Sequence, residues 1–176
     1  MLSNIINNYL TKFKDSSTSG RYADTLTLLD EMRAEFHRSP PKPSEVVDLL
    51  EELHSNPRFP GASLVFVAAW FSLSQDYIPL LCEIVSSEEL APWHEQAVEL
   101  LGELPDPVSV PALTKAVGYR WDFDEWRSVP RKALQSLFAI GTQDALAVVK
   151  EANHSDVPEI REQAHELMGG RKRERN

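Results

Sequence analysis

The sequence has little cysteine, little glycine and only short apolar runs, and each shortage excludes a class of protein. The one cysteine, Cys82, cannot form a disulfide within the chain, which suits a reducing compartment. Seven glycines and scattered β-branched residues argue against a sheet protein. The longest apolar run, residues 64–71, is far shorter than the roughly 20 residues that span a bilayer. Residues 1–14 lack the pattern of a secretion signal. We therefore expect an α-helical, cytoplasmic protein without membrane contacts.

Basic side chains are also fewer than acidic ones. The chain has 18 Lys and Arg against 27 Asp and Glu, which gives a formal net charge of −9. Four of these cations lie in the last six residues, RKRERN, so the rest of the chain is more acidic still. An anionic surface repels nucleic-acid phosphates and attracts basic proteins, although solubility alone also explains such acidity. We expect the basic tail, residues 169–176, to be disordered. We predict no nucleic-acid partner, and a contact made by this tail is a minor alternative.

Helical periodicity begins at the N-terminus. Apolar residues at three- and four-residue steps predict a helix over residues 2–14 and a second one over residues 22–38. The prolines of SPPKPS break the chain before a third helix, which ends at SNPRFPG. Three helices thus precede residue 61.

An internal repeat begins after residue 60. Segments 97–117 and 133–153 align at an offset of 36 residues, residues 66–85 match the same frame upstream, and residues 160–168 repeat its opening helix. The sequence pattern of each unit predicts a helix, a tight turn and a second helix. Because neither helix can bury its apolar stripe alone, neighbouring units must stack. The equated positions include Ala97/Ala133, Leu101/Leu137, Leu113/Val149 and Ala164, and the turns are Ser74-Gln75-Asp76, Pro105-Asp106-Pro107 and Gly141-Thr142-Gln143.

These residues carry a resemblance to a known family. The early alanine of each first helix, the LGELPDP and AIGTQD helix ends and the VPAL opening of a second helix resemble HEAT-type α-helical repeats, in the short variety known from phycobilin lyases. The resemblance covers about residues 62–168. It implies an all-α fold, with a right-handed α-solenoid of HEAT-like helix pairs at residues 61–168. Residues 1–60 lie outside the resemblance, and we interpret them as helices that cap the N-terminal end of the stack, in one structural unit overall. Such repeats form scaffolds, adaptors, inhibitors and a few enzymes, so they indicate fold better than function.

The His94-Glu95 pair raises the question of a metal site. A branch of this family, resembling deoxyhypusine hydroxylase, places such a pair at the start of several repeats, where the pairs bind two iron atoms. The equivalent positions here are Pro130-Arg131 and residues 160–162, which depart from that pattern. We therefore predict no metal, and we expect His94 to lie at a helix start, where a histidine usually faces solvent.

Other catalytic patterns are missing from the sequence. Cys82 lies beside Leu80, Leu81 and Ile84, and we interpret it as a small buried hydrophobe instead of a nucleophile. The chain has no glycine-rich phosphate loop, no CxxC pair and no nucleophile elbow. We predict no catalytic residue and no cofactor.

The segment GYRWDFDEWRS interrupts the repeat between Val117 and Val129. Large aromatic side chains are enriched at binding hot spots, and the acids between them would pair with Lys or Arg of a partner. The alternative is that Trp121, Phe123 and Trp126 pack between adjacent helices. A second acidic feature is a line of glutamates at four-residue steps on one helix face. The predicted partner-binding residues are Tyr119, Trp121, Asp122, Phe123, Asp124, Glu125, Trp126, Glu95, Glu99 and Glu103.

Two functions from different classes follow from these features. The first is a non-catalytic protein-binding module whose acidic surface captures a basic protein. In a bacterium, an immunity or antitoxin-type protein that neutralises a basic toxin would fit this description. The alternative is a bilin-lyase-like or metal-dependent HEAT-repeat enzyme or enzyme subunit. The sequence makes no prediction of the oligomeric state.

Overall fold

The computed structural model describes the backbone of residues 4–19 and 22–173 and the side chains of residues 4–15 and 26–169. Within these residues the chain contains helices and no strand, which confirms the all-α prediction. The α-helices are α1 (Asn4–Ser19), α2 (Tyr22–Arg38), α3 (Pro43–Ser55), α4 (Ala62–Phe71), α5 (Ile78–Ser86), α6 (His94–Glu103), α7 (Val110–Val117), α8 (Ser128–Ile140), α9 (Gln143–Glu151) and α10 (Pro158–Arg173). Short 3₁₀ helices are η1 (Gln75–Tyr77), η2 (Glu88–Trp93), η3 (Pro107–Ser109) and η4 (Ala152–His154). Of the tail predicted at residues 169–176, the backbone of residues 169–173 forms the end of α10, and residues 174–176 lie outside the described residues. None of the described helices is both long and apolar enough to cross a membrane.

The chain divides into two compact units, Met1–Leu80 and Leu81–Asn176, with the boundary inside α5. The first unit thus extends beyond residue 60, where the sequence suggests a division. In this unit α1 packs on α2, and both α2 and α3 pack on α4. The apolar face predicted for residues 2–14 is buried at Ile6, Tyr9 and Phe13, each at most 3% exposed. Burial and a hydrogen bond donated by its hydroxyl to Glu35 raise the pKa of Tyr9 to about 12.

The core of the first unit is the apolar run that the sequence shows at residues 64–71. Helix α4 is apolar on all sides, which is typical of a helix surrounded by other elements. Its neighbour α3 turns one apolar stripe inward. The buried residues of the two helices include Val46, Leu49, Leu50, Leu53, Leu64, Val65, Phe66, Ala68 and Ala69. Burial in the core thus explains most of the longest apolar run, although Trp70 within it is 40% exposed.

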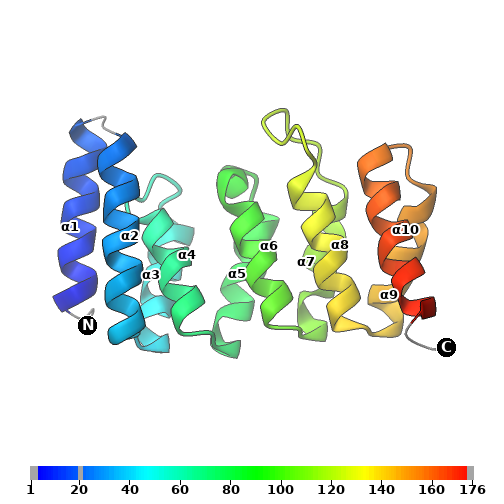
Figure 1. The fold of residues 1–176 in the computed structure, drawn as a ribbon, viewed down its shortest axis with the longest axis horizontal. Helices are drawn as coiled ribbons and strands as arrows, with labels where there is room; N and C mark the ends of the chain where they lie inside the picture. The colour runs from blue at the N-terminus through cyan, green and yellow to red at the C-terminus, as the bar shows by residue number, and fades with distance from the viewer. Residues whose placement is uncertain (1–3, 20–21, 174–176) are drawn as a thin grey trace. The chain divides into compact units, whose positions relative to one another are not determined.

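The second unit contains helices in two rows. Helix α8 contacts both α6 and α10 in one row, and α7 contacts α9 in the row behind it (Figure 1). Each of α7, α8 and α9 also packs against the helices that precede and follow it in the chain. The alanines that the repeat places in equivalent positions, Ala97, Ala133 and Ala164, are all 0% exposed. The repeat therefore identifies part of the core of this unit.

The three predicted turns share one local device, a side-chain oxygen that accepts a backbone hydrogen bond where the following helix begins. Such bonds satisfy N–H groups that have no partner inside the helix, and losing one typically costs about 1 kcal/mol. The pairs are Ser74 Oγ with Asp76 N at 3.3 Å, the Asp106 carboxylate with Val108 N at 2.8 Å, and Thr142 Oγ1 with Ala145 N at 3.3 Å. The turns are confirmed.

The close approach of α6 and α8 depends on Gly102. A Cβ at this position would lie 2.7 Å from Ser136 Oγ, a buried hydroxyl that is 3.0 Å from the carbonyl oxygens of Val98 and Lys132. We expect Gly102→Ala to lower the free energy of unfolding by about 1 kcal/mol, because overpacking outweighs the better helix propensity of alanine.

The control for this prediction is the same substitution in a Ser136→Ala background, where the obstructing oxygen is gone. There we expect Gly102→Ala to be neutral or stabilising. Urea unfolding of the four proteins gives the coupling energy between the two sites. Equal effects in both backgrounds would show that the hydroxyl is not the obstacle.

Candidate functional site

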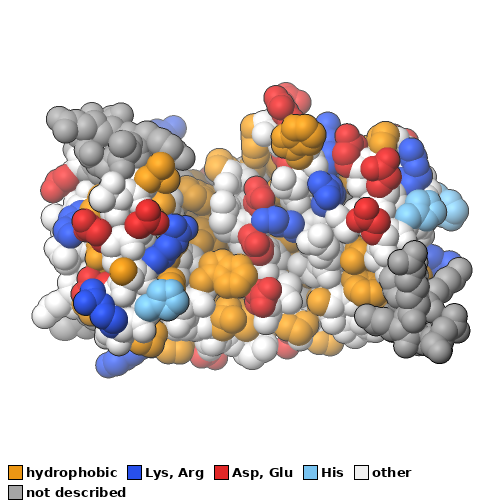
Figure 2. Space-filling view, viewed as in Figure 1, with side chains coloured by type: hydrophobic (Ala, Val, Ile, Leu, Met, Phe, Trp, Pro, Cys, Tyr) orange, Lys and Arg blue, Asp and Glu red, His pale blue; other side chains and the backbone are white. Residues whose placement is uncertain are grey.

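The segment that interrupts the repeat forms a loop, residues 118–127, between α7 and α8, and it is called here the aromatic loop. The loop extends beyond the ends of the neighbouring helices of its unit (Figure 1). At its position in the space-filling view, hydrophobic and acidic side chains lie together (Figure 2). Seven of the ten predicted partner-binding residues belong to this loop, so its geometry decides what the site can do.

The base of the aromatic loop is packed. The Tyr119 hydroxyl donates a hydrogen bond of 2.6 Å to the carbonyl oxygen of Val85, and burial raises the pKa of this hydroxyl. The Tyr119 ring stacks on His94 with the centroids 5.0 Å apart. Trp121 contacts both rings, at centroid distances of 5.3 Å from Tyr119 and 5.9 Å from His94. Tyr119 and Trp121 therefore hold the loop on its own unit. Of the three rings that the packing alternative names, only Trp121 is packed in this way.

The tip of the aromatic loop is exposed. The Phe123 ring lies parallel to Trp121 at a centroid distance of 6.1 Å, yet Phe123 remains 62% exposed. Trp126 is 74% exposed. The neighbouring acids Asp122 and Glu125 are exposed as well. The structure thus separates the predicted residues into a packed base and a tip of two rings and two carboxylates.

Asp124 points inward, unlike the other two acids of the aromatic loop. It is 9% exposed, and its carboxylate accepts hydrogen bonds from the backbone N–H of Ser128 at 2.7 Å and of Val129 at 3.1 Å. These are N–H groups of the first turn of α8, where a carboxylate is favoured both as an acceptor and by the helix dipole. Arg127, the residue before the helix, has the left-handed conformation, with φ of 53°. Asp124 therefore anchors the loop to α8, and its carboxylate is directed to the helix and not to the surface where a partner would bind.

His94 is buried at 0% exposure, so the expectation of a solvent-facing imidazole is wrong. Its surroundings come from the aromatic loop, which covers the start of α6. Nε2 lies 2.8 Å from the carbonyl oxygen of Ser87, a contact in which the ring nitrogen donates. Burial lowers the pKa of His94, and this effect outweighs the hydrogen bond to the Ser87 carbonyl, which favours the charged ring. His94 therefore belongs to the base of the aromatic loop.

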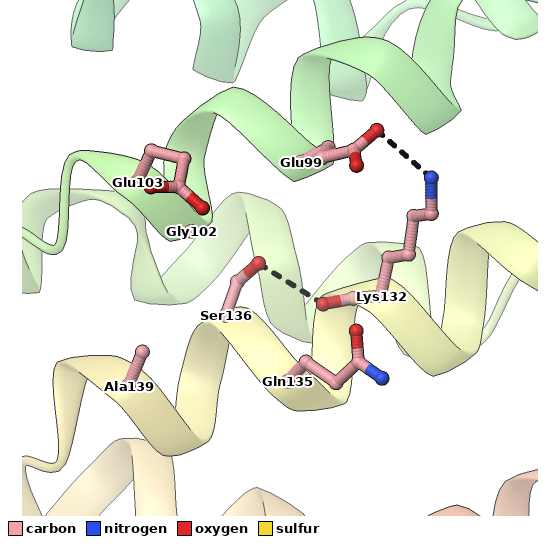
Figure 3. Close-up of a pocket in the computed structure, with 7 residues that line it drawn as sticks. All are labelled: Glu99, Gly102, Glu103, Lys132, Gln135, Ser136 and Ala139. Atoms are coloured by element: carbon pink, nitrogen blue, oxygen red, sulfur yellow. Dashed lines mark hydrogen bonds and ion pairs between the residues drawn. The ribbon is translucent and has the colours of Figure 1, made fainter.

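The predicted line of glutamates on α6 is partly neutralised from within the unit. Lys132 of α8 lies 2.9 Å from the Glu95 carboxylate and 2.8 Å from that of Glu99. Burial alone would lower the pKa of Lys132, but hydrogen bonds to both glutamates raise it above the usual value. The Lys132 bridge lies at one end of a shallow groove of about 230 Å³ between α6 and α8, which Glu103 also lines (Figure 3). This face thus carries less free negative charge than its sequence suggests.

The remaining reactive group, Cys82, is half-buried. Burial, with smaller effects of Asp106 and Glu83, raises the pKa of its thiol to about 11. The thiol is therefore protonated near neutral pH, whereas the thiolate is the nucleophilic form. In the part of the chain that the structure describes, no group of three or more His, Cys, Asp and Glu side chains is arranged to hold a metal ion.

The aromatic loop thus combines exposed rings and carboxylates with a packed base. A scan against protein-family models found no match, and searches of curated proteins and of solved structures found none either.

Proposed function

We propose that the protein is a non-catalytic protein-binding module that captures a basic protein through the tip of the aromatic loop. The observation that carries this proposal is the exposure of Phe123 and Trp126, at 62% and 74%, on a loop whose base is packed. Large exposed rings are unfavourable in water and are enriched among the residues that dominate binding energy at protein interfaces. A loop already held in place loses little conformational entropy when a partner docks.

The partner is a basic protein because the chain is acidic. A net charge of −9 attracts cationic proteins over a distance of about 10 Å at ordinary ionic strength. The two exposed carboxylates of the tip give this attraction a local target. In a bacterium, an immunity or antitoxin-type protein that neutralises a basic toxin fits these properties, and the single cysteine suits the cytoplasm.

We also propose that the helix pairs of residues 61–168 are HEAT-like repeats of a right-handed α-solenoid, with residues 1–60 as its N-terminal cap. The support is the row of α6, α8 and α10 with equivalent alanines buried in each helix. Stacked repeats give an extended surface for their length, and loops inserted between repeats are common places for binding residues. The aromatic loop is such an insertion.

The proposal is tested by capture of proteins from native lysate on the immobilised full-length chain. We expect basic proteins to be retained by the unchanged chain and to be lost from a Phe123→Ser/Trp126→Ser variant. The matched control is Val108→Ser, which removes a side chain of 67% exposure from a turn of the same unit. Capture should also weaken as salt is raised, because complementary charge contributes to the encounter. Equal capture by the loop variant and the control would contradict the proposal.

The enzyme alternative has its own test on the purified protein. Elemental analysis detects bound iron, and a visible absorption spectrum detects a bilin. A stoichiometric amount of either would favour the bilin-lyase-like or metal-dependent enzyme over a binding module.

A further inference from the structure

The tip of the aromatic loop leaves both of its exposed carboxylates without a cation of its own. Asp122 and Glu125 are exposed, and among the described residues neither forms an ion pair. No Lys or Arg of the described side chains lies over the ring of Phe123 or Trp126 either. Two consecutive turns, closed by hydrogen bonds from Asp124 N to Trp121 O and from Arg127 N to Asp124 O, thus expose two carboxylates and two rings that have no cation among the described side chains.

The two arginines of the aromatic loop could supply that positive charge, but both are bound elsewhere. Arg120 Nη1 donates to the carbonyl oxygens of Val117 at 3.0 Å and Tyr119 at 2.8 Å. Arg127 Nη1 donates to the carbonyl oxygens of Trp121 at 3.1 Å and Asp124 at 3.2 Å. Both guanidinium groups thus serve the backbone of the loop and hold its shape, and the carboxylates at the tip remain available.

We infer that the tip of the aromatic loop binds an arginine side chain of the partner protein through the exposed Trp126 ring and the exposed carboxylates of Asp122 and Glu125. This inference rests on the proposed function and names the chemical group that the loop takes. An indole is the aromatic ring that attracts cations most strongly, and an exposed contact of this kind adds to the attraction of the carboxylates.

Arginine fits these groups better than lysine does. A guanidinium is planar, so it can stack on the indole face while its edge donates hydrogen bonds to a carboxylate. An ammonium group is a compact, strongly hydrated charge that makes one of these contacts well, not both. The partner therefore presents an arginine, and replacement of that residue by lysine weakens the contact.

The test uses the full-length chain and the side-chain indole N–H signals in two-dimensional NMR spectra. Trp126→Phe removes one of the four tryptophan indole signals and so identifies the Trp126 signal. Three blocked hexapeptides are added in turn, with glycine alternating with arginine, with lysine or with citrulline, which is the uncharged isostere of arginine. We expect the Trp126 signal to move with the arginine peptide, less with the lysine peptide and not with the citrulline peptide.

A pair of charge-matched variants completes the test. In Asp122→Asn/Glu125→Gln we expect the apparent affinity for the arginine peptide to fall about fivefold, as is typical for the loss of two exposed ion pairs. Asp144→Asn/Glu151→Gln removes the same charge from exposed positions on α9 and should change the affinity little. Equal losses in both variants, or equal shifts with the arginine and citrulline peptides, would overturn the inference.

Failure of this inference and failure of the proposed function are distinguishable. If protein capture depends on Phe123 and Trp126 but the arginine peptide leaves the Trp126 signal in place, the inference is wrong and the binding module stands. If the peptide moves the signal but loop variants capture proteins as well as the unchanged chain does, the tip recognises arginine but is not the surface that captures proteins, and the proposed function is wrong.

Discussion

Replacing Asp124 with alanine is expected to lower the free energy of unfolding by about 2 kcal/mol. The carboxylate accepts hydrogen bonds from Ser128 N and Val129 N, and the second of these lies in a buried environment. Alanine removes both acceptors and leaves the N–H groups of the first turn of α8 without them, which costs more than the loss of an exposed interaction. Urea unfolding of the whole chain, followed by circular dichroism, measures the change.

The matched control is Asp122→Ala, two residues away in the same loop. Asp122 is exposed, so we expect its substitution to change stability by less than about 0.5 kcal/mol. Asp124→Asn retains one acceptor oxygen and should fall between the two alanine variants. If Asp122→Ala and Asp124→Ala were equally costly, the anchoring of the loop to α8 by Asp124 would be wrong.

The second large effect is a loss of stability in mild acid that comes from His94. Because burial holds the pKa of His94 below its usual value, the folded chain keeps the ring neutral while the unfolded chain takes up a proton. The stability contributed by the neutral ring is therefore fully present above the unfolded-state pKa of about 6.5 and is lost as the pH falls below it. The limiting slope for one proton is about 1.4 kcal/mol per pH unit.

The measurement compares free energies of unfolding at pH 7.5 and at lower pH for three proteins. In His94→Gln the pH dependence should become shallower than in the unchanged chain, although the variant is less stable at pH 7.5 because the ring stack with Tyr119 is lost. His154→Gln, at an exposed position, should keep the original pH dependence. If the His94 and His154 variants shared one pH profile, a neutral buried His94 would be contradicted.

The helices and turns could be predicted because their signals are local. Spacing of apolar residues marks the buried faces, and the repeat equates Ala97, Ala133 and Ala164, which are all buried. The turns follow from Ser, Asp and Thr at the starts of second helices, since each supplies an acceptor to a backbone N–H two or three residues later.

The residues next to His94 in the sequence do not indicate that its side chain is buried. The residues that cover it, Tyr119 and Trp121, lie in the aromatic loop more than 20 residues later in the chain. The different roles of the acids in the aromatic loop could not be predicted from the sequence for a related reason. Asp122 and Asp124 alternate with aromatic residues in the same way, and only the position at which α8 begins decides that Asp124 turns inward.

The bridge from Lys132 to the glutamates of α6 did have a signal in the sequence. At an offset of 36 residues, Lys132 is equivalent to Gln96, beside Glu95 in the preceding repeat. Stacking of equivalent helices therefore places this lysine close to Glu95 and Glu99, as the structure has it. A comparison of charged residues at equivalent positions of neighbouring repeats, in place of positions along one helix, therefore predicts that two of the three glutamates are paired.

The most direct test of the central claim, that the aromatic loop is the docking surface, is hydrogen–deuterium exchange of the full chain with and without a purified captured partner. We expect slower exchange within residues 118–127 when the partner is bound, and unchanged exchange in α9. Slower exchange confined to residues 4–80, with residues 118–127 unaffected, would contradict it.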